Sequence, residues 1–276
     1  MSHRQSDAPP RFPRSPAYSR YAEVYDRIGQ RLFGERIAAA SLHYLGECGI
    51  QPRRMIDLAC GTGAASMVFA AAGIHVVGLD SSRQMLRVAR KAAAAAGTPI
   101  EWRQEDMRCF NVTRPVELVT CFYDGMNYLL DLSEVTEVVA SVRQALTPGG
   151  LFIFDLNTCQ KFASNWNDSC YVAVDREDIF GLYQSWYQPD TGMSPLILTF
   201  FVRDKTGNWE RFEEEHVERA YPLEQIRSLL NDGGFETVAM LDYPDRCLRF
   251  GSTGSEQSQR VVFIAKRQFK MAESGV

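Results

Sequence analysis

One acidic residue and two glycines stand close together where an apolar segment of the chain ends. Residues 55–58 are apolar except for Asp57, and Gly61 and Gly63 follow before a run of small residues. Glycine permits backbone angles and close approaches that a Cβ atom would block, so a ligand can lie against the main chain beside the next helix N-terminus. The pattern therefore predicts a nucleotide-binding loop.

The loop differs from two common phosphate-binding motifs. A dinucleotide fingerprint has a third glycine three residues after Gly63, where this chain has Ser66, and a P-loop would continue with Gly-Lys-Ser/Thr. Asp57 would repel a nearby pyrophosphate, whereas it could accept hydrogen bonds from an amino group of the ligand or orient the loop. The ligand class that remains is a cationic nucleoside without phosphate, and S-adenosylmethionine fits that description.

A second acidic residue, Asp80, ends the next apolar segment at residues 74–80. It follows Asp57 by 23 positions, close to the roughly 20-residue spacing of a carboxylate that binds ribose hydroxyls. The next residues predict a capping box, with Ser81 as the cap of the following helix and Gln84 reaching back. We expect Asp80 to bind ribose; the alternative is that it only supports that cap.

These motifs resemble the class I S-adenosylmethionine-dependent methyltransferases, whose first motif is an acidic residue, a spacer and a short glycine run. Ala59 differs mildly, because the family often has glycine there. The resemblance implies that Asp106 accepts a hydrogen bond from the adenine amine and that Met107 packs on the ring. The residues assigned to the cofactor site are Tyr25, Asp57, Ala59, Gly61, Gly63, Asp80, Ser81, Met85, Asp106, Met107 and Phe122.

The elements that must position these residues alternate between strand and helix. Apolar segments predict five strands, at 55–58, 74–80, 100–104, 116–121 and 151–155, and two more at 236–242 and 260–266. A helix is expected at 133–146, and the segment 147–150 (Thr-Pro-Gly-Gly) is expected to break the chain before the fifth strand, as in the family. We therefore predict an α/β fold with a Rossmann-like seven-stranded sheet.

Residues 170–221 distinguish this chain from a minimal family member. Polar and apolar residues alternate there, and residues 204–208 have the composition of a hairpin turn. We predict an inserted antiparallel sheet after the fifth strand, which would form a roof over the substrate at the carboxyl ends of the parallel strands. The predicted organisation is a flexible arm at 1–19, a cofactor-binding core at 20–169, this roof at 170–221, and a C-terminal part at 222–276 that completes the core.

The last strand of the predicted roof places a histidine among acidic residues. Residues 212–219 alternate so that Phe212, Glu214, His216 and Glu218 share one face. A histidine in such surroundings is a candidate proton acceptor, because neighbouring negative charge stabilises its protonated form. The alternative is a solvated charged face.

Two tyrosines lie at the start of the predicted core, in a segment with helical periodicity. This segment and the last roof strand resemble small-molecule methyltransferases that include the amino-sugar N,N-dimethyltransferases, in which a tyrosine on the N-terminal helix covers cofactor and substrate. The resemblance assigns that role first to Tyr25 and then to Tyr21. The alternative is that both rings simply pack in the core.

The loop after the fourth strand, at 122–129, carries more aromatic and polar groups than solubility requires, and we expect the substrate to meet the methyl group there. Some sugar N-methyltransferases have an aromatic residue or histidine in this loop where this chain has Asn127 beside Tyr128. Sugar specificity is therefore not inherited from the resemblance. We assign catalysis to His216, Tyr25 and Asn127. The candidate acceptor-binding residues are Tyr21, Tyr123, Asp124, Asn127, Trp186 and Tyr187.

The composition argues against several other classes of protein. The chain has 276 residues, of which 45% are hydrophobic, and a net charge of −4; it has no apolar run of the ~20 residues that span a bilayer. Scattered Lys and Arg argue against a nucleic-acid substrate. Seven cysteines without a C-x-x-C pair and four histidines without ligand spacing predict neither a metal site nor a disulfide framework. We expect a cytoplasmic protein, with a homodimer as the candidate assembly.

The motifs together predict S-adenosylmethionine-dependent methyl transfer to a small molecule, with nitrogen slightly favoured over oxygen or carbon. In-line displacement at a sulfonium carbon gains much of its rate from positioning, so strong acid-base catalysis is optional. Two alternatives stay open. One is a cyclase or related enzyme on the same fold that uses the cofactor only electrostatically, and the other is a non-catalytic module that binds it.

Overall fold

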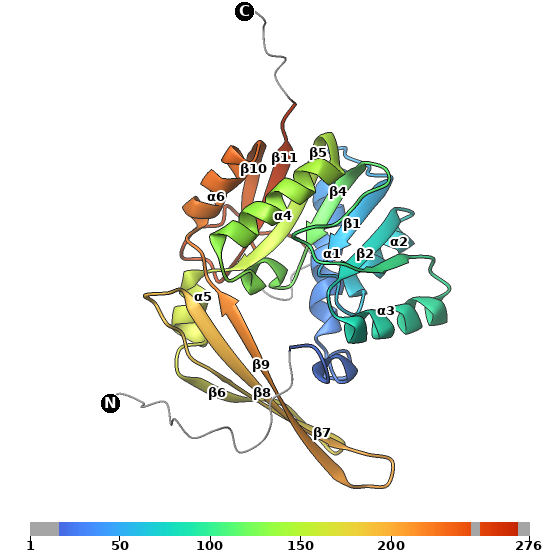
Figure 1. Cartoon of the computed structure of the whole chain (residues 1–276), viewed down its shortest axis with the longest axis vertical. Helices are drawn as coiled ribbons and strands as arrows, with labels where there is room; N and C mark the ends of the chain where they lie inside the picture. Colours follow the sequence, from blue (N-terminus) through green and yellow to red (C-terminus); the bar gives the residue numbers. More distant parts are fainter. Residues whose placement is uncertain (1–16, 244–248, 270–276) are drawn as a thin grey trace, which may run out of the picture.

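The computed structural model describes residues 17–243 and 249–269. Its described part contains a seven-stranded sheet with helices on both faces, and a four-stranded antiparallel sheet beyond one end of it (Figure 1). Of the arm predicted at 1–19, all but the last three residues lie outside the described residues.

The larger sheet has the strand order β10-β11-β5-β4-β1-β2-β3. Its strands are β1 (Arg54–Leu58), β2 (His75–Asp80), β3 (Glu101–Gln104), β4 (Val116–Cys121), β5 (Leu146–Asn157), β10 (Phe235–Asp242) and β11 (Arg260–Arg267). The first five run parallel, whereas β11 is antiparallel to both β5 and β10. This arrangement confirms the predicted seven-stranded α/β fold.

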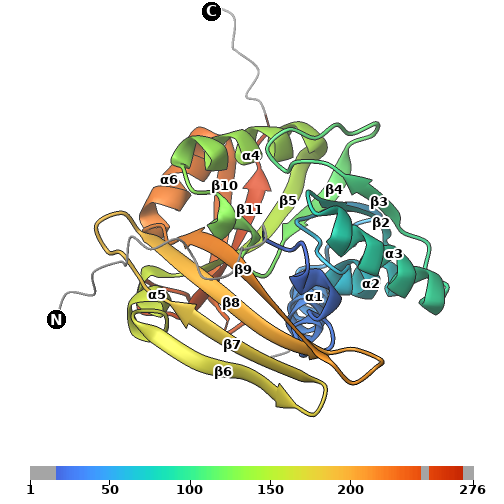
Figure 2. The same ribbon diagram turned by 60° about the horizontal axis from the view of Figure 1, so that its bottom comes forward.

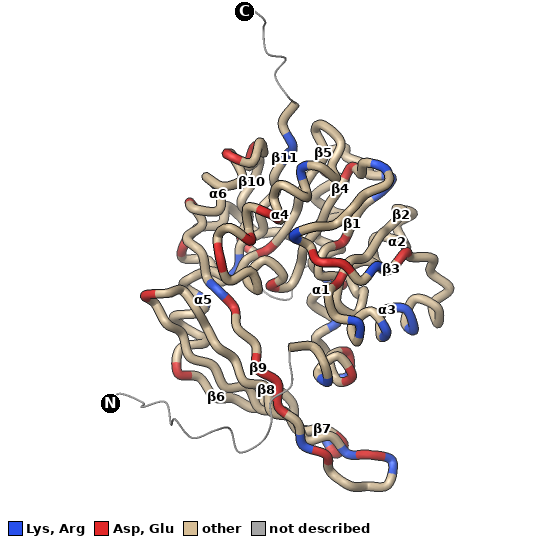
Figure 3. Tube along the Cα trace, in the orientation of Figure 1, with Lys and Arg blue, Asp and Glu red and all other residues tan. Residues whose placement is uncertain are grey.

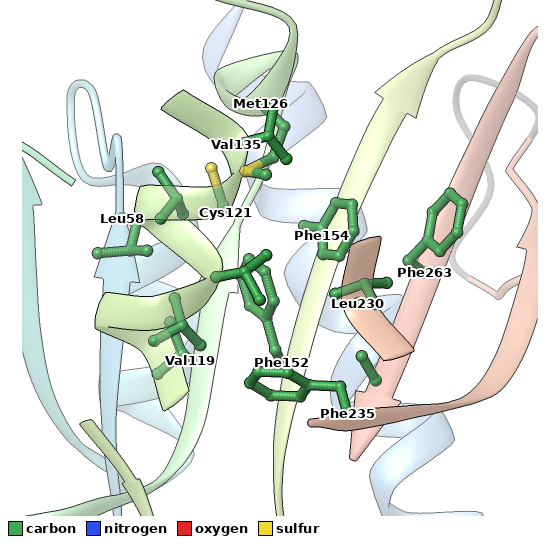
Figure 4. Close-up of a cluster of buried hydrophobic side chains, with 14 of the residues drawn as sticks. Leu58, Val119, Cys121, Met126, Val135, Phe152, Phe154, Leu230, Phe235 and Phe263 are labelled. Carbon is green, nitrogen blue, oxygen red and sulfur yellow. The ribbon is translucent and has the colours of Figure 1, made fainter. Parts of the chain in front are cut away.

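Helices cover both faces of this sheet. The helices of the described part are α1 (Arg31–Glu47), α2 (Ala64–Ala71), α3 (Arg83–Ala96), α4 (Leu132–Ala145), α5 (Cys159–Asn165) and α6 (Leu223–Asp232), with the 3₁₀ helices η1 (Tyr21–Glu23) and η2 (Gly125–Tyr128). Val135 of α4 and Leu230 of α6 pack with Phe152 of β5 on one face (Figure 4), whereas Ile37 of α1 and Phe69 of α2 belong to the cluster on the other.

The segment 147–150 differs from the turn that the sequence predicts before the fifth strand. β5 already begins at Leu146, and the register with β4 shifts between Val116 and Leu118, so the segment forms a bulge within the strand. Gly149 in this bulge adopts φ +79°, a conformation that glycine reaches without steric strain.

The smaller sheet is the insertion that the sequence predicts after the fifth strand, and we call it the roof sheet. Its strands, in spatial order, are β6 (Ser169–Arg176), β7 (Ile179–Ser185), β8 (Met193–Arg203) and β9 (Trp209–Arg219). β8 and β9 form a hairpin with its turn at 204–208, where Asp204 accepts hydrogen bonds from the amides of Thr206 (2.8 Å) and Asn208 (2.9 Å). Figure 2 shows this sheet beside the segment that precedes α1.

The segment before α1 packs against the roof sheet and does not extend α1. The sequence pattern predicts a helix from Tyr21 onward, but the structure has only the short η1 followed by turns. Gly29 adopts φ +91° and interrupts the helical path. As a result, Tyr21 and Val24 join a buried cluster with Phe200 and other residues of the roof sheet.

Charge and hydropathy are distributed along the chain without a membrane-spanning pattern. No helix of the described part combines the length and the apolar character that crossing a membrane requires. Acidic and basic residues are interspersed along most of the trace, and α3 carries several basic ones (Figure 3). Within residues 17–243 and 249–269, no group of three His, Cys, Asp or Glu side chains is arranged to hold a metal ion.

Candidate active site

Asp57 lies near the carboxyl end of β1 and is almost fully buried. Its carboxylate oxygens accept hydrogen bonds from the hydroxyls of Ser66 on α2 (2.5 Å) and Thr120 on β4 (2.8 Å). Burial raises the pKa of Asp57 to about 6, although these hydrogen bonds act in the opposite direction. The carboxyl group thus connects three elements and also lines the cavity beside them.

Asp80, at the end of β2, connects the glycine loop to the start of α3. Its carboxylate accepts hydrogen bonds from the amides of Gly61 (2.8 Å) and Ser82 (2.7 Å), and burial raises its pKa. The cap of α3 is Ser82, whose hydroxyl accepts from the Met85 amide (3.2 Å). The prediction that Ser81 is the cap is therefore wrong by one residue, because the extended backbone continues through Ser82.

A cavity of about 530 Å³ opens at the carboxyl ends of these strands, and we call it the first cavity. Its volume is within the range of cofactor sites, and its two carboxyl groups suit a ligand with positive charge. Most of the predicted cofactor-site residues line it. They are Tyr25, Asp57, Ala59, Gly61, Asp80, Ser81, Met85, Met107 and Phe122.

Gly63 does not line the first cavity; it allows Trp102 to pack against the glycine loop. The residue has φ +79°, and a Cβ atom there would collide with the Trp102 ring. A Cβ atom at Gly78 on β2 would also come within 2.5 Å of that ring. Alanine at either position would have to displace the indole, so packing requires both glycines.

Asp106 also lies outside the lining of the first cavity. Arg108 donates hydrogen bonds to its carboxylate from Nη2 (2.6 Å) and Nε (3.0 Å), and these bonds lower the pKa of Asp106. Arg108 binds Glu134 at the start of α4 as well. Of the predicted adenine-binding pair, only Met107 therefore reaches the cavity.

A second cavity, of about 750 Å³, adjoins the first beneath the roof sheet. Both cavities are lined by Tyr18, Tyr25, Gln30, Tyr123 and Tyr128. Ligands bound in the two cavities can therefore meet at these side chains.

Five of the residues predicted for catalysis or acceptor binding line the second cavity: His216, Tyr21, Tyr25, Tyr123 and Asp124. Trp186 and Tyr187 lie outside its lining, and the Tyr187 ring packs 5.8 Å from that of Phe162. Asn127 is fully buried and donates hydrogen bonds to main-chain carbonyls at the ends of β5 and β9 (3.1 and 2.9 Å). The structure thus uses Asn127 to hold η2 in place.

Glu218 lines the second cavity, although the sequence pattern predicted no role for it there. Its side chain is 2% exposed, and its Oε2 atom has no hydrogen-bond partner within the part of the chain that the structure describes. Burial raises the pKa of Glu218 and the negative charge of Asp124 adds to the effect, whereas the positive charges of Arg260 and Lys161 act in the opposite direction. The alternation at 212–219 was the available signal, because it put Glu218 on the same face as His216.

Arg260 of β11 fixes the loop that follows β4. Its fully buried guanidinium donates to Asp124 (2.6 Å) and to Asp155, which in turn accepts from the Tyr123 amide (2.7 Å). Tyr123 and Asp124 adopt φ of 58° and 68°, a region that L side chains rarely occupy. The ion pairs hold both residues in that conformation against the second cavity.

His216 has a partner on each ring nitrogen. Its Nδ1 lies 2.8 Å from the Tyr128 hydroxyl, and its Nε2 lies 3.2 Å from Glu214. The Tyr18 hydroxyl donates to the Tyr128 oxygen (2.9 Å). The sequence indicated no individual role for Tyr18 or for Tyr128, although Tyr128 lies in the loop at 122–129 that was expected to meet the substrate. Nothing local indicates that η2 and the N-terminal segment meet at β9.

Known proteins match most of this chain. The family described as "Methyltransferase domain" matches residues 55–150. A protein of Geobacillus sp. (strain WCH70) that is named as a methyltransferase is 32% identical over 252 residues, which cover 91% of this chain and 99% of that protein. The dTDP-3-amino-3,4,6-trideoxy-alpha-D-glucopyranose N,N-dimethyltransferase of Streptomyces venezuelae is 33% identical over 164 residues, 59% of this chain and 67% of that protein.

The fold is also found among solved structures. The S-adenosylmethionine-dependent methyltransferase from Clostridium acetobutylicum ATCC 824 matches with a TM-score of 0.77 and 24% identity, over 91% of this chain and 99% of that one. The glycine loop and the two carboxyl groups of the first cavity agree with this assignment. The chain belongs to the S-adenosylmethionine-dependent methyltransferases, and S-adenosylmethionine is its cofactor.

Proposed function

We propose that this methyltransferase transfers the methyl group of its cofactor to the nitrogen of a small-molecule amine. The cofactor binds in the first cavity and the amine in the second, so that the reacting atoms meet beside Tyr25, Tyr123 and Tyr128. The shared lining of the two cavities supports this arrangement.

Four residues account for cofactor binding in this proposal. Asp80 binds the ribose hydroxyls with lone pairs that its bonds to two backbone amides leave available. Asp57 favours the positively charged ligand through its own charge. Met107 packs against the adenine, and Tyr25 covers the ligand from the segment before α1.

The observation that carries the choice of an amine is the buried carboxyl group of Glu218. One of its oxygens has no hydrogen-bond partner among the described residues, although the side chain is buried and lines the second cavity. A buried acceptor gains most from a ligand that supplies a charged donor. An alkylammonium supplies that donor, and the N-methylated product keeps the positive charge.

Aromatic side chains around Glu218 support the same ligand class. The second cavity is lined by Tyr18, Tyr21, Tyr25, Tyr123 and Tyr183. Aromatic faces attract cations, more strongly when both are shielded from water. The Streptomyces venezuelae relative is named for the methylation of an amino group.

The reaction needs alignment and the removal of one proton. S-adenosylmethionine supplies a methyl group on a positively charged sulfur. As the nitrogen–carbon bond forms, the carbon–sulfur bond breaks and its electron pair returns to sulfur. Before this attack the ammonium loses a proton to the Tyr128 oxygen, and Tyr128 passes its own proton to Nδ1 of His216. Alignment of the two ligands can contribute up to about 7–11 kcal/mol.

Oxygen methylation is the second candidate, and the contact between His216 and Tyr128 favours it. A hydroxyl loses its proton as it attacks, so it depends more strongly on a base than an amine does. The candidates differ at Glu218, because a neutral phenol gains little from a carboxylate. The cytoplasmic location and the homodimer stay predictions from the sequence.

Release of S-adenosylhomocysteine distinguishes the two candidates. The protein is incubated with S-adenosylmethionine and, separately, cyclohexylamine, benzylamine, dTDP-3-amino-3,4,6-trideoxy-alpha-D-glucopyranose or catechol. Release with an amine that is lost in Glu218→Gln and kept in Glu215→Gln supports the proposal; Glu215 is an exposed residue of the same strand. Release with catechol alone, unchanged in Glu218→Gln, overturns it in favour of oxygen methylation.

A further inference from the structure

A single carboxyl group on β9 binds four consecutive residues of the N-terminal segment. Glu214 accepts hydrogen bonds from the Tyr18 amide (2.7 Å), the Ser19 hydroxyl (3.0 Å), the Arg20 amide (2.5 Å) and the Tyr21 amide (2.7 Å). Few side chains collect so many donors from one short stretch of chain. Residues 18–21 are thereby attached to the roof sheet.

The Glu214 carboxyl group is fully buried and depends on these donors. Burial acts to raise its pKa, but hydrogen bonds from His216 and from the amides of Tyr21 and Arg20 hold the pKa below its usual value. Withdrawing the donors of the segment would remove most of the hydrogen bonds to this charge and leave it the contact with His216, which is costly. The charge therefore favours the attached conformation of the segment.

The attached segment forms walls of both cavities. Tyr18 lines the first and second cavities, Ser19 lines the first, and Tyr21 lines the second. At its other side, the Tyr18 carbonyl accepts a hydrogen bond from the Ser82 hydroxyl (3.1 Å), beside the predicted ribose site. The segment thus spans from the start of α3 to β9.

A second pair of contacts on β9 reinforces the attachment. Arg20 forms an ion pair with Glu210 (2.8 Å), and its guanidinium lies 4.7 Å from the centre of the Phe212 ring. The side chains of Arg20 and Glu210 are more exposed than that of Glu214, so their ion pair contributes less to the attachment of the segment. Among the described residues of β9, Glu214 is the only buried acidic residue that forms hydrogen bonds with residues 18–21.

We propose that Glu214 holds residues 18–21 closed over the bound cofactor, so that exchange of S-adenosylhomocysteine for S-adenosylmethionine requires release of these hydrogen bonds. Glu214 is a positioning residue in this role. Glu214 also contacts His216 (3.2 Å), so the same carboxyl group holds the segment closed and orients the imidazole that Tyr128 contacts. The inference rests on the cofactor cavity and does not depend on which atom of the acceptor is methylated.

The test uses S-adenosylhomocysteine as the probe and compares Glu214→Gln with Glu215→Gln in the full chain. One oxygen of Glu214 accepts from Ser19, Arg20 and Tyr21, and the other accepts from the Tyr18 amide. Glutamine has no charge, and the NH2 group that replaces one oxygen cannot accept, so the attachment of the segment is weakened. We expect Glu214→Gln to raise the dissociation rate and the Kd of S-adenosylhomocysteine by about tenfold or more. Glu215→Gln should leave both unchanged. Stopped-flow release and calorimetry measure the two quantities.

Trypsin provides a readout of the segment itself, because Arg20 is a cleavage site within it. In the wild type, saturating S-adenosylhomocysteine should slow cleavage after Arg20, and in Glu214→Gln this protection should be largely lost. A merely structural role would lower the melting temperature without changing either the release rate or this cleavage.

Two results would overturn the proposal. One is a Kd and a release rate in Glu214→Gln that match those of Glu215→Gln. The other needs no variant: the amide protons of Arg20 and Tyr21 in the wild type would exchange with solvent equally fast with and without bound S-adenosylhomocysteine. A negative result in either test would not contradict the proposal of nitrogen methylation, because neither test measures acceptor turnover.

Discussion

The hydroxyl oxygen of Tyr128 lies 2.8 Å from Nδ1 of His216, and it is Tyr128 that lines both cavities. The other ring nitrogen of His216 is occupied by Glu214. In the proposed reaction, a proton that leaves the acceptor reaches the imidazole through the tyrosine hydroxyl. The sequence predicts His216 as the base, and our proposal places Tyr128 between this base and the acceptor.

Tyr128→Phe removes this hydroxyl and keeps the ring. We expect kcat to fall by about 10²-fold, the lower end of general acid-base contributions, while binding of S-adenosylhomocysteine changes little. Tyr44→Phe is the control, because Tyr44 lies on α1 outside the lining of both cavities. The rate of S-adenosylhomocysteine release is measured against pH with the acceptor that reacts fastest. A wild-type rate and pH profile in Tyr128→Phe would rule out the relay.

Glu218→Gln tests the ammonium site. The variant keeps the size of the side chain but cannot form the carboxylate that a bound ammonium stabilises, so we expect the KM for an amine acceptor to rise by about tenfold or more. The Kd of S-adenosylhomocysteine should not change, because Glu218 lines only the second cavity. Steady-state kinetics and calorimetry give the two values. An unchanged KM would mean that the amine binds elsewhere.

Asp80→Ala tests the ribose assignment. The change removes a ribose partner and also frees the Gly61 amide that Asp80 accepts from, so we expect the Kd of S-adenosylmethionine to rise by about tenfold or more. Asp175→Ala, at an exposed position of the roof sheet, is the control. Calorimetric affinity equal to that of the wild type would show the assignment to be wrong.

The raised pKa of Asp57 predicts that cofactor binding releases protons. Its pKa of about 6 leaves the carboxyl group about half protonated at pH 6. A positively charged ligand favours the ionised form, so binding of S-adenosylmethionine near pH 6 should release up to about half a proton. Calorimetry in two buffers with different ionisation enthalpies measures the release. It should shrink in Asp57→Asn, and an identical release in that variant would assign the proton to another group.

We expect the substitution Arg260→Met to lower the free energy of unfolding strongly. The substitution leaves Asp124 and Asp155 without the buried cation that binds them both, and breaking a buried ion pair in this way costs about 3–5 kcal/mol. Urea unfolding measures the free energy. Arg227→Met, which removes an exposed ion pair with Glu224, should cost less than about 1 kcal/mol. Equal losses in the two variants would contradict this reading of Arg260.

The fold could be predicted from the sequence because its signals are local. Apolar segments of strand length, the glycines after β1 and the turn at 204–208 each depend on the periodicity or backbone freedom of neighbouring residues. The errors arose where a local rule met a tertiary contact. The segment 147–150 has turn composition, but pairing with β4 draws it into a bulge of β5.

The first cavity could likewise be predicted, since its main residues follow directly after consecutive parallel strands. Gly63 and Asp106 are the exceptions, because a side chain outside the cavity determines the role of each. Gly63 is required by Trp102, which comes from β3. Asp106 is bound by Arg108, whose guanidinium also reaches α4.

The sequence by itself determined the family, the cofactor and the presence of a roof sheet. Only the tertiary structure decided which side chains meet around the second cavity. Glu214 and Ser19 are 195 positions apart, and His216 and Tyr128 are 88 apart. Such pairs form where the roof sheet packs against the N-terminal segment and against η2, and no local periodicity encodes that packing.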